Sequence, residues 1–117
     1  LRRASETAQV YGECGGYMVL GQTLVDAAGT PHKMAGLLDL ETSFSTRKLH
    51  LGYRRLRAEH GAFPGAWAGH EFHYATTVKA KGEPLFAAQD AEGTKLPPMG
   101  LRDGPVSGSF AHLIAPL

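Results

Sequence analysis

The chain has 117 residues, a length that fits one small domain or part of a larger one. Its hydrophobic share of 43% and charged share of 20% are typical of a folded globular protein and exclude a disordered one. The formal net charge is +1, with no dense basic run and no apolar stretch long enough for a membrane span or signal peptide, so we expect neither nucleic-acid nor membrane partners. Because a single cysteine cannot form an internal disulfide, we expect a cytoplasmic protein.

The first predicted elements are the end of a helix over residues 1–8 and a short buried strand that ends near Tyr11. A helix that leads directly into a buried strand is typical of the second half of a crossover unit. We therefore expect a parallel neighbour of this strand, and the start of the domain, upstream of the sequence.

Cys14, the only cysteine, follows this strand and precedes an apolar helical turn over residues 17–20 that Gly21 closes. This pattern predicts a strand-to-helix elbow with the thiol at the helix N-terminus, where the helix dipole and backbone N–H groups favour the thiolate. Gly15 and Gly16 leave room for a substrate carbonyl. A lone cysteine is otherwise most often a small buried apolar residue, but the glycines around it favour a nucleophile.

Downstream, the pattern changes from helical to strand-rich. Residues 23–35 predict a hairpin, and residues 49–56 and 70–78 predict strands separated by a turn over residues 61–65. Shorter strands are predicted over 84–89, 99–102 and 105–109, with turns between them. The sequence therefore predicts an α/β domain with many strands, few helices, no internal repeat and no linker.

A nucleophilic cysteine needs a base, and His112 is the best-placed of the six histidines. It follows a short strand of small residues, whose carboxyl end we expect at the same sheet edge as the elbow. The alternative is an ordinary histidine in a surface loop.

A second histidine cluster lies in the run from His70 to Tyr74. In a strand, His70 and Phe72 face one side and Glu71 and His73 face the other, so Glu71 and His73 are predicted to form a polar pair. A zinc site is not expected, because the histidines are three residues apart and no third ligand is evident. A structural or substrate-positioning role is predicted instead.

Four segments together resemble the glutaminase domain of the cobyrinate or hydrogenobyrinate a,c-diamide synthase family. They are residues 11–18 (YGECGGYM), 47–54 (RKLHLGYR), 69–74 (GHEFHY) and 108–113 (GSFAHL). The resemblance implies a three-layer, flavodoxin-like class I glutamine amidotransferase domain. Residues 1–117 would be the C-terminal part of that domain, which would be incomplete at its N-terminus.

The resemblance also implies partners and cofactors. Glutamine would be the substrate of this part, and a corrin macrocycle would bind to an ATP-binding synthetase domain expected upstream. No Gly-x-x-x-x-Gly-Lys-Ser/Thr loop occurs in the chain, so ATP and Mg²⁺ would bind to that other domain, and no metal or cofactor is expected here. Whether the protein forms a homo-oligomer stays open.

By the same resemblance, Cys14 is the nucleophile, His112 transfers protons, and the backbone N–H of Gly15 stabilises the oxyanion. Many class I enzymes have a glutamate two residues after the histidine, but Ile114 occupies that position, so a Cys–His dyad is expected. Met18 replaces a glutamine that is common in the wider class. Part of the oxyanion hole would come from an upstream loop, so the chain alone is expected to be weakly active or inactive.

Substrate contacts are predicted at three further positions. The guanidinium of Arg47 is a candidate for the α-carboxylate of glutamine, with a solvated loop charge as the alternative. Glu71 and His73 are candidates for positioning the substrate.

Three alternatives to this function remain. The chain could belong to cobyrate synthase, a related amidotransferase that acts on other corrin side chains. It could be a cysteine hydrolase with no link to ammonia transfer. It could also be a non-catalytic interaction domain with the same fold.

Overall fold

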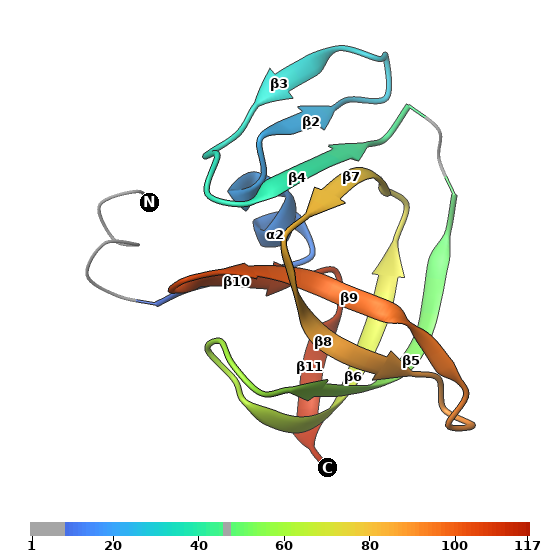
Figure 1. Ribbon diagram of the computed structural model, residues 1–117. Helices are drawn as coiled ribbons and strands as arrows, with labels where there is room; N and C mark the ends of the chain where they lie inside the picture. Colours follow the sequence, from blue (N-terminus) through green and yellow to red (C-terminus); the bar gives the residue numbers. More distant parts are fainter. Residues whose placement is uncertain (1–8, 46–47) are drawn as a thin grey trace.

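The computed structural model describes residues 9–45 and 48–117 (Figure 1). These residues form one short helix and eleven strands in two sheets. The helix is α2 (Gly15–Leu20), and the strands are β1 (Val10–Glu13), β2 (Thr23–Val25), β3 (Pro31–Lys33), β4 (Asp39–Ser43), β5 (His50–Ala58), β6 (Gly65–His73), β7 (Thr76–Lys81), β8 (Glu83–Gln89), β9 (Lys95–Asp103), β10 (Val106–Ser109) and β11 (His112–Pro116).

Within the described residues, the larger sheet has the order β1-β10-β9-β8-β5-β6-β11 and the smaller sheet has the order β3-β2-β4-β7. β1 and β10 run parallel, with Glu13 opposite Ser109, whereas the other strand pairs of the larger sheet run antiparallel. α2 lies between the two sheets, where it contacts β1 and β10 of one and β2 and β4 of the other (Figure 1). The turn from β1 into α2 therefore lies at the carboxyl end of a parallel strand pair.

The core has two parts. The first cluster surrounds α2 and consists of the buried face of the helix and side chains from both sheets. Tyr17, Met18 and Leu20 form that face, whereas Val19 is exposed. A second cluster lies on the inner face of β5 and β8, where Leu56 and Phe86 are almost fully buried. Burial of apolar area at about 25 cal/mol per Å² is the main stabilising contribution of both clusters.

The predicted strand-rich α/β class is confirmed, and so is the local structure around the elbow. β1, α2 and the closing Gly21 lie where the sequence predicts them, and β2 and β3 form the predicted hairpin. β8, β9 and β10 correspond to the three predicted short strands, although β9 is longer than predicted.

The prediction of one strand over residues 70–78 is wrong. β6 ends at His73 and β7 begins at Thr76, and the two strands belong to different sheets. Ala75, which has no exposed surface, lies at the point where the chain passes between the sheets. Side-chain alternation shows where a strand exists but not which sheet it joins, so the sequence pattern does not reveal this change.

Two predictions fall outside the described residues, namely the helix end over residues 1–8 and the position of Arg47. Among the residues that the structure describes, no helix has the length and apolar character needed to cross a membrane.

Candidate functional site

The backbone of Cys14 makes a sharp elbow between β1 and α2. Its φ of 51° and ψ of −109° make it the one non-glycine residue with positive φ in the described part of the chain. Its N–H donates to the carbonyl of Ser109 (2.9 Å), and its carbonyl accepts the N–H of Met18 (3.2 Å). Such conformations cost about 1–3 kcal/mol and are found mainly at functional sites, because neighbouring contacts must hold them. Cys14 itself is half-buried and unpaired.

Glycines let β1, β10 and α2 approach one another closely at the elbow. A Cβ atom on Gly12 would lie 2.7 Å from the backbone carbonyl carbon of Gly16, and one on Gly108 would lie 2.5 Å from the carbonyl oxygen of Gly12. Neither space admits a side chain without moving backbone. The elbow thus depends on two glycines that belong to different motifs.

The first hydrogen bond of α2 joins the N–H of Met18 to Cys14, so the N–H groups of residues 15–17 have no carbonyl of this helix to pair with. Gly15 is exposed directly after the thiol. Its N–H therefore stays a candidate oxyanion donor, as the sequence predicts.

His112 is the first residue of β11, three residues after β10 ends. The buried hydroxyl of Ser109 accepts the N–H of Ala111 (2.9 Å) and closes the turn between the two strands. Because the carbonyl of Ser109 also accepts the N–H of Cys14, the elbow is tied directly to the turn that leads to His112. Both residues follow the carboxyl ends of adjacent parallel strands, which is the arrangement expected from the sequence.

One acidic residue near His112 was not predicted. Oε1 of Glu13, the residue directly before Cys14, lies 3.4 Å from Nδ1 of His112. Its Oε2 accepts the backbone N–H of Leu113 (2.9 Å) and the hydroxyl of Tyr11 (3.2 Å). Ile114, where class I enzymes often have glutamate, is instead 57% exposed.

Glu71 and His73 form the predicted polar pair, with Nε2 of His73 2.7 Å from Oε1 of Glu71. The guanidinium Nε of Arg54 donates to Oε2 of Glu71 (3.1 Å), and Nδ1 of His73 lies 3.0 Å from the carbonyl of Ala75. Burial alone would raise the pKa of Glu71, but the hydrogen bond and charge of His73, followed by those of Arg54, lower it. Arg54, Glu71 and His73 thus form an internal ion-pair network. A role of Glu71 and His73 in positioning the substrate stays a prediction.

Four rings pack in a continuous row beside this network. His50 stacks on His73 with centroids 4.7 Å apart, His73 stacks on Phe110 at 3.9 Å, and Phe110 meets Tyr17 edge-on at 5.2 Å. Phe110 is part of the turn that leads to His112. The ring of His73 thus supports that turn from within the molecule.

Donor atoms of His50, Glu71 and His73 lie within 4.8 Å of one another, a set that could be considered for a metal ion. The two imidazole planes, however, are only 11° from parallel. Histidine ligands direct lone pairs within the ring plane, so two stacked rings cannot both point at one ion without tilting. Separately, burial, followed by the charge of His73, lowers the pKa of His50 and so favours its neutral form.

The outer face of β5 and β6 continues to His112. Tyr53 lies opposite His70 with their rings 5.1 Å apart, and His70 lies opposite His112 on β11. Phe72 is exposed on the same face, whereas Glu71 and His73 face inward. This alternation is the one predicted from the sequence.

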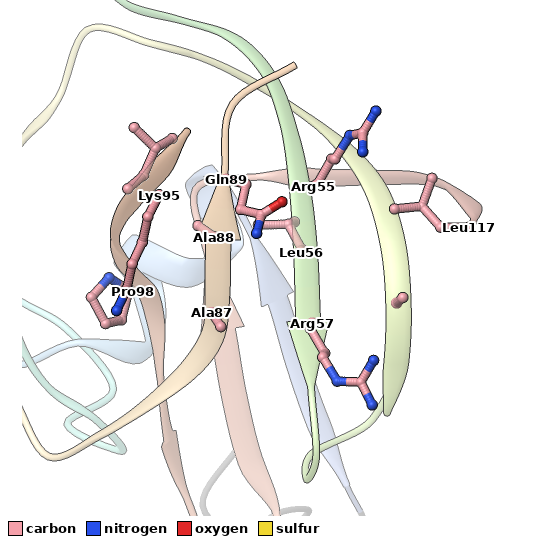
Figure 2. Close-up of a pocket in the computed structure, with 11 residues that line it drawn as sticks. Arg55, Leu56, Arg57, Ala87, Ala88, Gln89, Lys95, Pro98 and Leu117 are labelled. Carbon is pink, nitrogen blue, oxygen red and sulfur yellow. The ribbon is translucent and has the colours of Figure 1, made fainter. Parts of the chain in front are cut away.

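Among the described residues, three cavities have linings that include neither Cys14 nor His112 nor a residue next to either, and the largest of them, of about 520 Å³, is bordered by Arg57, Leu85 and Arg102. A second, of about 360 Å³, is bordered by Tyr17, His73 and Phe110. A third, of about 370 Å³, lies between β5, β8 and β9 over Leu56 and Ala88. Figure 2 shows the guanidinium groups of Arg55 and Arg57 on one side of β5, away from Lys95.

Comparison with known proteins gives a consistent result. The family model of the CobB/CobQ-like glutamine amidotransferase domain matches residues 1–116. A protein of Brucella abortus is 57% identical over 116 residues (95% of this chain and 26% of that protein), and one of Sinorhizobium is 54% identical over 113 residues (95% and 26%). A protein of Rhodobacter capsulatus is 51% identical over 120 residues (98% and 27%). All three are named hydrogenobyrinate a,c-diamide synthase, and the chain spans about a quarter of their length.

Proposed function

The chain belongs to the CobB/CobQ-like glutamine amidotransferase domain family, and on that basis we propose that it is the glutaminase part of an amidoligase of cobalamin biosynthesis. The observation that carries this proposal is the strained Cys14 elbow, joined through Ser109 to the turn that bears His112. The complete enzyme would use ATP and glutamine to amidate the a and c acetate side chains of a corrin.

The proposed reaction begins when the thiolate of Cys14 attacks the side-chain amide carbon of glutamine. His112 gives a proton to the leaving nitrogen, and the carbon–nitrogen bond breaks. Ammonia departs, and the glutamyl group remains on Cys14 as a thioester. His112 then takes a proton from water, which attacks the thioester and releases glutamate and the thiolate.

The developing negative charge on the amide oxygen needs a donor in each tetrahedral intermediate. The N–H of Gly15 is the proposed local donor, and loss of one such donor typically costs about 10²–10³-fold in rate. Arg47 stays our candidate for the α-carboxylate of the substrate.

The ammonia would pass to a synthetase domain in the remaining part of a longer polypeptide. That domain would bind ATP and Mg²⁺ and activate each acetate as an acyl phosphate, which ammonia converts to the amide. We place this enzyme in the cytoplasm. Hydrogenobyrinate is the favoured corrin, because the relatives that are 51–57% identical are named hydrogenobyrinate a,c-diamide synthase. The same names disfavour the alternative that the chain belongs to cobyrate synthase.

The test uses the complete polypeptide that contains this chain, with ATP, Mg²⁺ and hydrogenobyrinate. We expect Cys14→Ala to abolish amidation that depends on glutamine while amidation from ammonium chloride continues at the wild-type rate. If the variant still uses glutamine, Cys14 is not the nucleophile. If the wild type releases no glutamate and a glutamine analogue does not label it, the chain is a non-catalytic domain of this fold.

A further inference from the structure

We propose that Glu13 is the positioning residue for His112, so that the site is a Cys–His–Glu arrangement whose acid comes from β1. This inference rests on the proposed glutaminase function and deepens it. The residue directly before the nucleophile would supply the carboxylate that Ile114 cannot. The dyad expected from the sequence would then be incomplete.

The contact between the two side chains has the geometry that orientation requires. Oε1 of Glu13 is 3.4 Å from Nδ1 of His112, within ion-pair range and longer than an ordinary hydrogen bond. Such contacts are often long in a site without substrate and shorten when substrate binds. A carboxylate at Nδ1 leaves Nε2 free to exchange a proton with Cys14, and it stabilises the imidazolium formed in that exchange.

Glu13 is itself held in place from two directions. The N–H of Leu113, the residue next to His112, donates to Oε2 at 2.9 Å, and the hydroxyl of Tyr11 donates to the same oxygen at 3.2 Å. Burial, followed by the negative charge of Glu13, raises the pKa of Tyr11, so this phenol remains a donor. The ring of Tyr11 meets Phe63 edge-on at 4.9 Å, which limits its movement.

No other described carboxylate is paired with His112. Glu71 faces the opposite side of the sheet and is bound by His73 and Arg54. The neighbour of His112 across the strands is His70, which is not an acid. Within the described residues, the carboxylate that serves His112 is therefore that of Glu13.

A purely structural role is the competing explanation, because Glu13 also ties β1 to β11 through Leu113. Glu13→Gln separates the two roles. The glutamine keeps an amide oxygen that accepts the N–H of Leu113, but it has no charge to stabilise an imidazolium. Glu92→Gln is the matched control, since Glu92 is an exposed acid in the turn between β8 and β9.

The experiment measures alkylation of Cys14 by iodoacetamide against pH, together with glutamate release, in the complete polypeptide. Cys14 is the only cysteine of the chain, so peptide mapping assigns the label to it. We expect Glu13→Gln to lower kcat about 10- to 100-fold with KM nearly unchanged. We also expect the midpoint of its alkylation profile, which reports formation of the Cys14 thiolate, to move to higher pH, because the imidazolium that accompanies the thiolate has lost its carboxylate partner.

Glu13→Asp should recover part of the rate and keep that midpoint near its wild-type position, while Glu92→Gln should match the wild type in both. An alkylation profile and kcat for Glu13→Gln equal to those of the wild type would overturn the inference. If Glu13→Gln does not fold, a wild-type kcat for Glu13→Asp, which withdraws the carboxylate by one methylene, would overturn it instead. Glutamate release by the wild type tests the proposed function separately, since alkylation requires no glutamine hydrolysis.

Discussion

The positive φ of Cys14 predicts that replacing this residue by glycine makes the fold more stable than replacing it by alanine. Both variants lose the thiol, so in the folded state they differ mainly in the strain that a Cβ atom causes at φ 51° and ψ −109°. That strain is about 1–3 kcal/mol, and the extra entropy of glycine in the unfolded chain offsets about 0.5–1 kcal/mol of it. We expect Cys14→Gly to unfold with roughly 1 kcal/mol more free energy than Cys14→Ala, which for 117 residues is a Tm difference of about 4 °C.

Urea unfolding followed by the fluorescence of Trp67, the single tryptophan, measures this difference in the purified chain. Trp67 packs against the second core cluster, and its indole N–H donates to the carbonyl of Phe63 (2.9 Å), so its emission should change on unfolding. Val19 on α2 supplies the matched pair. At this exposed helical position, Val19→Gly should be less stable than Val19→Ala by about 1 kcal/mol.

The sign of the stability difference between Cys14→Gly and Cys14→Ala shows whether the elbow is strained. If Cys14→Gly is no more stable than Cys14→Ala while the Val19 pair behaves as expected, the elbow stores no strain. Cys14 would then be placed by its contacts with Ser109 and Met18 alone.

Two further predictions concern packing and pH. Gly12→Ala should lower the free energy of unfolding by about 1–3 kcal/mol and kcat by about 10²-fold, because its Cβ would push α2 and the elbow apart. Gly16→Ala is the control and should cost no stability, because no atom lies within 4 Å of the added Cβ. Equal stabilities of the two variants would contradict this prediction. The folded-state pKa values of His50 and Glu71 are both lowered, so the unfolded chain binds their protons more readily than the folded chain does. The free energy of unfolding should therefore fall on acidification, first below about pH 6.5 through His50 and again below about pH 4.5 through Glu71. Urea titrations from pH 8 to pH 3.5 should show both losses, and a first loss that persists in His50→Asn would mean that another group causes it.

Local chemistry explains which parts of the fold the sequence predicts. The strand, thiol, glycines and apolar turn from Val10 to Gly21 are consecutive, so their pattern specifies the elbow without distant contacts. The pairing of Glu71 with His73 likewise follows from strand alternation alone.

Most of the features that the sequence missed depend on contacts between distant residues. Residues 70–78 keep a strand pattern while the chain moves from one sheet to the other at Ala75, and nothing local distinguishes the two sheets. β4 was not predicted, because its buried residues include the polar Thr42 and Ser43 rather than an apolar run. Glu13 meets Leu113 across 100 positions, and its value as an acid for His112 appears only when β1 and β10 lie side by side.

The ring row explains why four separated motifs mark one site. Tyr17, His50, His73 and Phe110 come one from each motif, and they stack in the order His50, His73, Phe110, Tyr17. At one end of the row, Tyr17 belongs to the helix that follows Cys14, and Phe110 belongs to the turn before His112. A substitution at His50 can therefore shift Cys14 or His112 only by moving rings that are already close-packed. The contacts of His50 and His73 are therefore those of a packing support for α2 and for the turn that leads to His112.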